Sequence, residues 1–228
     1  MFASFRPLLA RAPHGDGHPV LVLPGMGATD RSTAPMRGFL AGLGYQVHGW
    51  RLGRNMPTPV VIDALRNRFA ELYQRHGGVP MSLVGWSLGG IYAREIAAIR
   101  PDTVREVITL GSPFQDVPGE ESHPAALIRA LRPDLARRRG VNRPGQGPLR
   151  IPSTAIFSRT DGIVPWRAAR NIDGPFAESI EVVSSHVGLG HHPGVLWAVA
   201  DRLAQPAGGW RPFVPDGAWA RLFPSHRS

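Results

Sequence analysis

The stretch VPMSLVGWSLGG spans residues 79–90 and decides the fold of this chain. Its first half is short and apolar, which is typical of a strand buried on both faces. Residues 91–99 then switch to helical spacing and stop before Pro101. Between the two lies the pattern Gly85-X-Ser87-X-Gly89. The sequence therefore predicts a strand, a sharp turn and a helix in succession, with Ser87 at the turn.

The glycines around Ser87 have a steric reason. Such a turn holds the serine in a crowded, strained conformation that lifts its hydroxyl above the sheet. A Cβ at Gly85 or Gly89 would collide with the facing strand or helix, so glycine fits both positions. The helix start behind Ser87 also points N–H groups toward any negative charge that develops there. The alternative is an ordinary turn in which Ser87 only caps the helix.

The other apolar runs alternate with helical segments along the chain. We expect further strands over about residues 18–23, 45–50, 104–110, 153–158 and 180–184, and helices over about 30–43, 60–76 and 193–204. This alternation favours an α/β fold, with a mostly parallel sheet of about six strands and helices on both faces. Active residues should then lie at the carboxyl ends of strands, where the loops converge.

Length favours one domain over residues 1–228, and two segments stand out within it. Residues 113–150 show no strand pattern, and so long a connection is usually functional, so we interpret them as a small lid or cap insertion. A passive surface excursion is the alternative. Residues 205–228 form an aromatic-rich tail, which we expect to pack back onto the domain.

Composition excludes several classes of protein. The net charge is +9 and all 26 basic residues are arginine, but they are scattered, with one cluster at 137–139, so we expect a solvated surface and no nucleic-acid partner. There is no cysteine, hence no disulfide and no thiolate metal site. No stretch reaches membrane-spanning length, and the start is too interrupted for a signal peptide, so we expect a cytoplasmic protein without stable membrane insertion. A secreted form with its leader removed would look the same, and oligomeric state stays open.

Two further residues complete a nucleophilic site around the serine. A serine hydroxyl attacks poorly until a base removes its proton, and the base needs an orienting carboxylate. In this architecture the partners follow in the order Ser, acid, His. Asp161 comes after the strand at 153–158 and His186 after the strand at 180–184. We therefore predict Ser87, Asp161 and His186 as the catalytic residues.

Rival residues lie near both partners. His191 and His192 are close enough to His186 to reach inward from the same loop, but Pro193 fits the first turn of the last helix and makes both of them candidate capping residues. Asp173 and Glu178 are rival acids, although neither directly follows a predicted strand.

The oxyanion of such a reaction needs two backbone donors. Leu88 N–H, directly after the nucleophile, is one. The other is expected from the loop after the first strand, where Gly25 lets the chain approach Ser87 and Met26 N–H is the candidate donor. We predict no metal, because the histidines lack carboxylate partners at ligand spacing, and no cofactor, because phosphate-binding glycine motifs are absent.

The sequence resembles the α/β-hydrolases, and within them the bacterial lipases and esterases. The matching pieces are LPGMG (23–27), GWSLGG (85–90), TLGSP (109–113), DGIVP (161–165) and SHVGL (185–189). The resemblance implies hydrolysis of carboxylic esters through an acyl-enzyme, with Met26 and Leu88 supplying the oxyanion hole. It departs from the family in two places: lipases commonly carry His where this chain has Pro24, and often His where it has Trp86.

We therefore expect a serine esterase or lipase whose partner is a small-molecule ester or lipid. Apolar residues near the site would favour acyl chains: Trp86, Phe114, Ile163, Val164 and Val187. Transfer of the acyl group to an alcohol or peroxide, as in an acyltransferase or perhydrolase, needs the same three residues and stays open. Amide hydrolysis and a ligand-binding protein without catalysis are the remaining alternatives.

Overall fold

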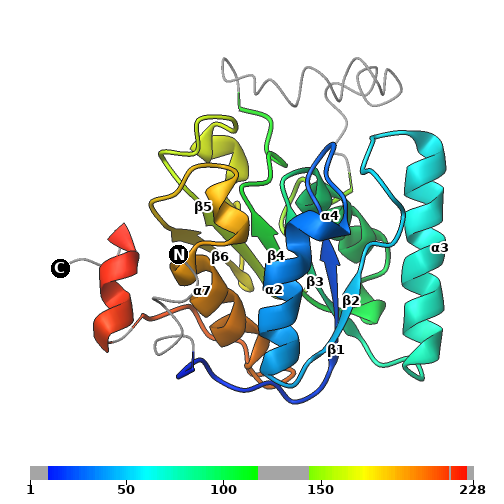
Figure 1. Ribbon diagram of the computed structural model, residues 1–228, viewed down its shortest axis with the longest axis horizontal. Coiled ribbons are helices and arrows are strands. Elements are labelled where there is room, and N and C mark those ends of the chain that lie inside the picture. The colour runs from blue at the N-terminus through cyan, green and yellow to red at the C-terminus, as the bar shows by residue number, and fades with distance from the viewer. Residues whose placement is uncertain (1–9, 118–143, 216, 225–228) are drawn as a thin grey trace.

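A parallel sheet of six strands organises the computed structural model, which describes residues 10–117, 144–215 and 217–224 (Figure 1). The strand order is β2-β1-β3-β4-β5-β6, and every neighbouring pair is parallel. The strands are β1 (Pro19–Leu23), β2 (Gln46–Gly49), β3 (Met81–Trp86), β4 (Val104–Leu110), β5 (Ser153–Phe157) and β6 (Ala177–Glu181). The α/β fold predicted from the sequence is confirmed.

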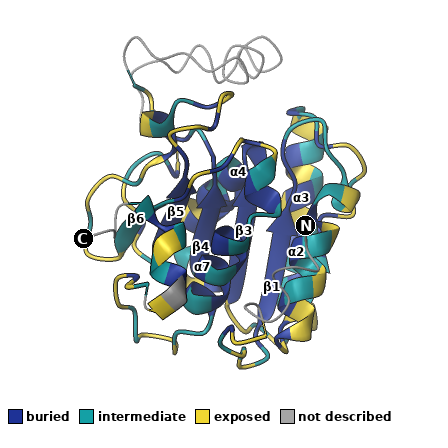
Figure 2. Ribbon diagram, turned by 60° about the vertical axis from the view of Figure 1, so that its left-hand side comes forward, coloured by how far each residue is buried: buried dark blue, intermediate teal, exposed yellow. Residues whose placement is uncertain are grey.

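Helices cover both faces of the sheet. The α-helices are α2 (Asp30–Gly42), α3 (Pro59–Arg75), α4 (Leu88–Ile99) and α7 (Pro193–Leu203), and short 3₁₀ helices span Pro101–Thr103, Trp166–Ala169, Gly188–Gly190 and Gly217–Leu222. Alternate residues of β1 point to opposite faces. Val20 and Val22 pack in one apolar cluster with α2 and α7, and Leu21 and Leu23 in another with α3 and α4. The buried strands thus lie between two helical layers (Figure 2).

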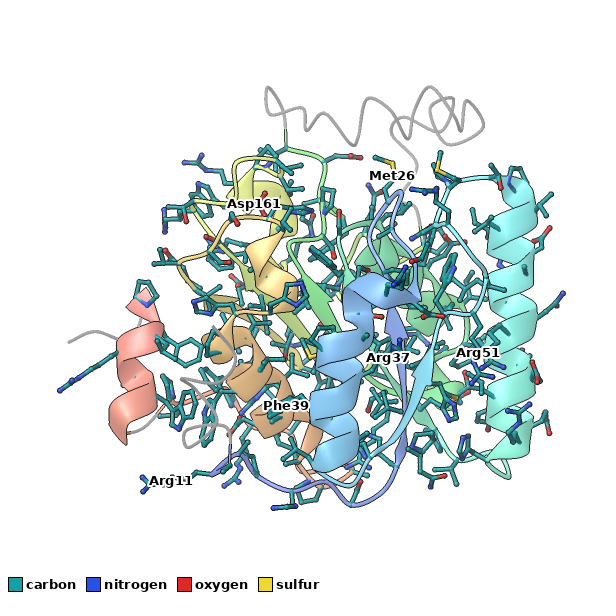
Figure 3. The ribbon with its side chains drawn as sticks, viewed as in Figure 1. Arg11, Met26, Arg37, Phe39, Arg51 and Asp161 are labelled. Carbon is teal, nitrogen blue, oxygen red and sulfur yellow. The ribbon has the colours of Figure 1, made fainter. Side chains whose placement is uncertain are left out.

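The register of the sheet brings the carboxyl ends of the strands to one edge. Leu23 of β1 pairs with Gly85 of β3, and Trp86 pairs with Leu110 of β4. Met26 and Asp161, which follow β1 and β5, lie at the same end of the molecule, opposite Arg11 (Figure 3). Loops far apart in the sequence therefore meet at this edge.

Strand β6 starts earlier than its sequence suggests. We expected it over 180–184, whereas it spans Ala177–Glu181. Among the described residues its only neighbour is β5, and Glu178 and Ser179 are only half-buried. The polar residues of an edge strand break the apolar run on which the expectation depended.

The tail packs on the domain where it is described. Trp219 stacks on Trp197 of α7 with ring centroids 4.0 Å apart. Phe213 and Phe223 meet edge to face at 4.8 Å and are buried in the same cluster as α7. The short 3₁₀ helix of the tail, Gly217–Leu222, thus lies beside α7 (Figure 1).

Residues 118–143, the larger part of the predicted lid, lie outside the described residues, but the segment that follows them is anchored. Arg94 of α4 is almost fully buried. It donates to the carbonyl oxygens of Gly145 at 2.6 Å and Gly147 at 2.8 Å, and to Asn171 Oδ1 at 2.7 Å. Its guanidinium lies 3.8 Å from the centre of the Phe114 ring. Burial lowers the pKa of Arg94 to about 10, so the charge persists at neutral pH.

In the part of the chain that the structure describes, no helix combines the length and the apolarity that crossing a bilayer requires.

Candidate active site

Ser87 lies at the junction of β3 and α4 and has a backbone conformation that residues other than glycine rarely adopt. Its φ is 53° and its ψ −120°, outside the regions open to most L-residues. The strained turn is held by Ser87 N–H, which donates to Leu110 O of β4 at 2.8 Å. The Ser87 side chain makes no capping hydrogen bond to α4. The alternative of a serine that merely caps the helix is therefore wrong, and its hydroxyl is left for another task.

The flanking glycines are required by close backbone approach, as predicted. A Cβ on Gly85 would lie 2.4 Å from Gly90 Cα in the facing helix. A Cβ on Gly89 would lie 2.5 Å from Leu23 O at the end of β1. Both distances are well inside van der Waals contact, and backbone atoms cannot turn aside as a side chain can. Because Gly85 and Gly89 have no side chains, the start of α4 can lie directly against the sheet, and this close packing sets the position of Ser87.

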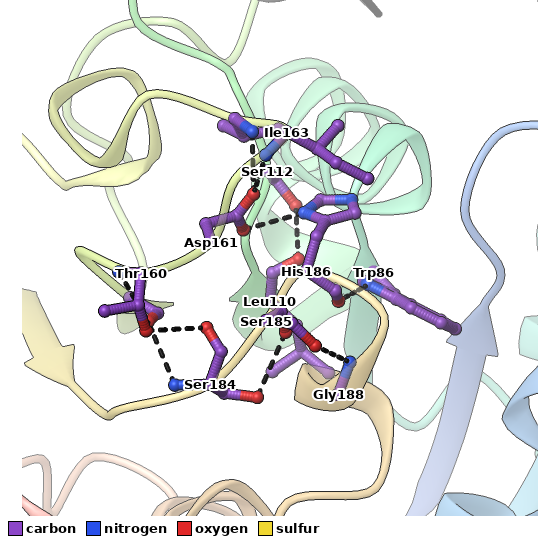
Figure 4. A network of polar contacts seen from close by, with 12 residues as sticks. Trp86, Leu110, Ser112, Thr160, Asp161, Ile163, Ser184, Ser185, His186 and Gly188 are labelled. Atoms are coloured by element: carbon purple, nitrogen blue, oxygen red, sulfur yellow. Dashed lines mark hydrogen bonds and ion pairs between the residues drawn. The ribbon is translucent and has the colours of Figure 1, made fainter.

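Asp161 and His186 are both buried and contact each other at the same edge of the sheet (Figure 4). His186 Nδ1 lies 2.7 Å from Asp161 Oδ2. The other carboxylate oxygen accepts Ile163 N–H at 2.9 Å and Val164 N–H at 2.6 Å, and His186 N–H donates to Asp161 O at 2.9 Å. Because a carboxylate only accepts, Nδ1 carries the hydrogen and Nε2 is the basic atom of the neutral ring.

Two neighbours connect this pair to the nucleophile turn. A Cβ on Gly111, which directly follows β4, would lie 3.0 Å from Asp161 Oδ2 and 3.2 Å from His186 Nδ1. Trp86, the residue before Ser87, donates its indole N–H to His186 O at 3.2 Å (Figure 4). Ser87, Asp161 and His186 are each only 5–7% exposed. The structure thus gathers all three predicted residues at the carboxyl ends of β3, β5 and β6.

The rival residues have other partners or positions. His192 Nδ1 accepts Gly194 N–H at 3.2 Å and caps α7. Burial lowers the pKa of His192. The ring of His191 lies edge-on to Trp86 at 6.3 Å. Glu178 accepts from Arg202 and from Phe213 N–H, and Asp173 is exposed. His186 and Asp161, in contrast, contact each other at 2.7 Å.

The loop after β1 approaches Ser87, as expected for an oxyanion loop. A Cβ on Gly25 would lie 3.4 Å from Ser87 Cβ. Met26 follows it and is half-buried. On the other side, Leu88 is the first residue of α4, so its N–H has no partner within the helix. The loop that contains Met26 and the first turn of α4, which contains Leu88, thus both lie next to Ser87.

Comparison with known proteins bears on the fold. No family model matches the sequence. Homoserine O-acetyltransferase of Thermobifida fusca (strain YX) is 29% identical over 131 residues, which are 56% of this chain and 33% of that protein. The chain therefore spans about a third of the length of that relative.

Solved structures match over most of both chains. A structure from work on the metagenome-derived lipolytic enzymes LipS and LipT has a TM-score of 0.58 at 16% identity, covering 84% of this chain and 93% of its own. Pyrethroid hydrolase PytH has a TM-score of 0.58 at 20% identity, covering 81% and 96%. The thioesterase domain of the curacin biosynthetic pathway has a TM-score of 0.53 at 14% identity, covering 83% and 92%. The chain has the α/β-hydrolase fold.

Within this α/β-hydrolase fold, the apolar residues expected near the substrate fall into two groups. Ile163 is 41% exposed and Val187 61% exposed, next to Asp161 and His186. Trp86, Phe114 and Val164 are buried. Phe114 lies beneath the Arg94 guanidinium, and Val164 packs in a small cluster with Phe157. The described residues therefore leave Ile163 and Val187 as the accessible members of the predicted set.

Among the described residues there is no group of three or more His, Asp or Glu side chains placed to hold a metal ion.

Proposed function

We propose that this chain is a serine hydrolase of carboxylic esters that acts through an acyl-enzyme. The observation that carries the proposal is the 2.7 Å contact between His186 Nδ1 and Asp161 Oδ2, at the edge of the sheet where Ser87 occupies a strained turn. Solved structures with a similar fold include lipolytic enzymes, a pyrethroid hydrolase and a thioesterase domain, which supports ester or thioester chemistry for this chain.

The first half of the reaction forms the acyl-enzyme. Ser87 Oγ attacks the ester carbonyl while His186 Nε2 takes the hydroxyl proton. The charge that develops on the carbonyl oxygen is stabilised by the N–H groups of Met26 and Leu88. His186 then gives the proton to the leaving alcohol, and the acyl group stays on Ser87.

The second half repeats these roles with water. His186 takes a proton from the water as its oxygen attacks the acyl group, and it returns the proton to Ser87 as the acid leaves. Asp161 does not itself change protonation state. It keeps the hydrogen on Nδ1 and stabilises the imidazolium that forms in each half.

The test is hydrolysis of p-nitrophenyl esters from acetate to palmitate. Replacing the nucleophile of such a triad lowers kcat by roughly 10⁶, so Ser87→Ala should be inactive. Ser153→Ala is the matched control, because Ser153 is a buried serine at the amino end of β5, opposite the carboxyl ends of the strands where the site lies. Wild-type turnover in Ser87→Ala would overturn the proposal. The chain-length optimum separates an esterase from a lipase.

A second candidate function is acyl transfer to an alcohol. It is favoured by the similarity to a homoserine O-acetyltransferase over 56% of this chain. The acyl-enzyme would be the same, and only the acceptor would differ. Product analysis with an added alcohol such as homoserine distinguishes the two, since transfer gives a new ester and hydrolysis gives the free acid.

A further inference from the structure

The loop that follows β1 lies beyond Leu23, the last residue of that strand that pairs with β3. Residues 24–28 form no helix or strand, and yet Gly25 lies against Ser87. Pro24 brings no side-chain donor. Pro24 and Gly25 are buried, and buried backbone groups need hydrogen-bond partners.

Asn55, in the connection between β2 and α3, is that partner. It is fully buried. Its side-chain Nδ2 donates to Pro24 O at 2.7 Å. Its main-chain carbonyl oxygen accepts Gly27 N–H at 2.7 Å, and its main-chain N–H donates to Ala28 O at 2.8 Å. The three bonds bracket Gly25 and Met26 from both sides. One residue thus fixes the loop before and after the expected oxyanion donor.

The same bonds select which amide faces the site. Gly27 N–H is taken by Asn55 O, and Ala28 N–H donates to Gly25 O at 3.2 Å. Of the three N–H groups that follow Gly25, Met26 N–H is therefore the one left for an oxyanion. An oxyanion donor must lie about 2.7–3.1 Å from the oxygen it stabilises, so its placement needs a rigid support.

The carbonyl group that Asn55 Nδ2 binds, Pro24 O, lies between the loop that contains Met26 and the start of α4 that contains Leu88. A Cβ on Gly89 would lie 2.7 Å from Pro24 O, so this carbonyl lies against the start of α4, next to Leu88. Asn55 Oδ1 has no partner among the described residues, whereas Nδ2 meets Pro24 O. The amide group therefore acts as a donor to Pro24 O, which a carboxylate of the same shape cannot do.

We infer that Asn55 is a positioning residue that holds Met26 N–H in place for the oxyanion. The inference rests on the proposed esterase function and adds to it the residue that holds the loop at residues 24–28. It assigns to Asn55 no contact with the substrate. Its effect should therefore fall on kcat, through the transition state, and leave KM nearly unchanged.

Asn55→Asp and Asn55→Ala test the inference. Loss of an oxyanion donor lowers kcat by about 10²–10³, and a displaced donor should cost less, so we expect kcat to fall roughly 10- to 100-fold. For Asn55→Asp, the ratio of its kcat to the wild-type value should rise as the pH falls from 8 to 6, since only the protonated carboxyl can donate to Pro24 O. Asn171→Ala is the matched control for the hydrogen-exchange measurement, because Asn171 Nδ2 also donates to two backbone carbonyls, Ser153 O and Glu178 O, and its Oδ1 accepts from Arg94, so that none of its contacts is with residues 23–28.

Folded Asn55 variants with kcat within twofold of wild type and a constant ratio across pH would overturn the inference while leaving the proposed function intact. Hydrogen exchange of the peptide covering residues 23–28 gives a readout that needs no substrate. If this peptide exchanges about tenfold faster in both Asn55 variants and at the wild-type rate in Asn171→Ala, the result supports the inference that Asn55 holds the loop. Unchanged exchange overturns it. If wild type and Ser87→Ala are equally inactive, the proposed function fails, and exchange alone still decides whether Asn55 braces the loop.

Discussion

Replacing Glu106 by Gln should make the protein more stable above pH 7. Glu106 lies on β4 opposite Ser82 of β3, near the amino ends of the strands and so away from the candidate site. Ser82 Oγ donates to Glu106 Oε1 at 3.2 Å and also lies 2.8 Å from His18 Nε2. Burial raises the pKa of Glu106 to about 7, against the opposing effects of the Arg105 charge and the Ser82 hydrogen bond.

The sign and size of the effect follow from linkage. Because the pKa of Glu106 in the folded protein exceeds its ordinary value of 4.5, the folded state binds more protons between pH 4.5 and about 7. Stability that is present below pH 4.5 is therefore lost as the pH rises through this window. At about 1.4 kcal/mol per pH unit, the loss is about 3 kcal/mol. A glutamine has the same shape and carries no charge, so it escapes this loss.

The assay is urea unfolding of wild type and Glu106→Gln at pH 5 and pH 9. The free energy of unfolding of the variant, relative to wild type, should rise by about 3 kcal/mol between the two pH values. Comparing the two proteins cancels every other group that titrates equally in both. Glu71→Gln, which removes an exposed carboxylate on α3, is the control and should run parallel to wild type. Parallel curves for Glu106→Gln as well would refute the reasoning.

Two further predictions concern packing and pH. Phe223→Ala removes a fully buried ring and should lower the free energy of unfolding by about 3–5 kcal/mol. Val214→Ala, at a side chain that is 78% exposed, is the control and should change it by no more than about 0.5 kcal/mol. Equal urea midpoints for wild type and Phe223→Ala would show that the tail does not contribute to stability. His48 Nε2 lies 2.7 Å from His76 Nε2, and burial and the nearby positive charges lower the pKa of His48 to about 4. Stability should therefore fall as the pH drops from 6.5 toward 4, and His48→Gln should reduce that dependence of the melting temperature; an unchanged dependence would argue against the pair.

Much of the fold was readable from the sequence, for a physical reason. Strands buried on both faces need continuous apolar runs, and β1, β3 and β4 have them, so their positions were predicted closely. The crowded turn at Ser87 requires glycine two residues before it and two residues after it, and this spacing can be recognised in the sequence. The adjacency of Asp161 and His186 followed from their positions after neighbouring strands.

The sequence did not predict the burial of two polar side chains, those of Arg94 and Asn55. Arg94 is buried beneath the segment at 144–149, although arginine is ordinarily exposed, and this contact places Phe114 under a guanidinium instead of at an open mouth. Asn55 gave no signal, because a loop asparagine usually marks a turn, and only its three hydrogen bonds reveal its position. Pairings over such sequence distances depend on the assembled fold.

The two ends of the connection after β4 are tied to each other. Gln115 donates to Gln146 O at 3.0 Å, and Gln146 donates to Asp116 Oδ2 at 2.9 Å. A chain that leaves and re-enters the domain at one point can change in length at little entropic cost, because loop closure depends only weakly on the number of residues. Because Gln115, Asp116 and Gln146 are joined in this way and Arg94 holds the returning segment, a connection of another length between these points would leave the sheet and its loops unchanged.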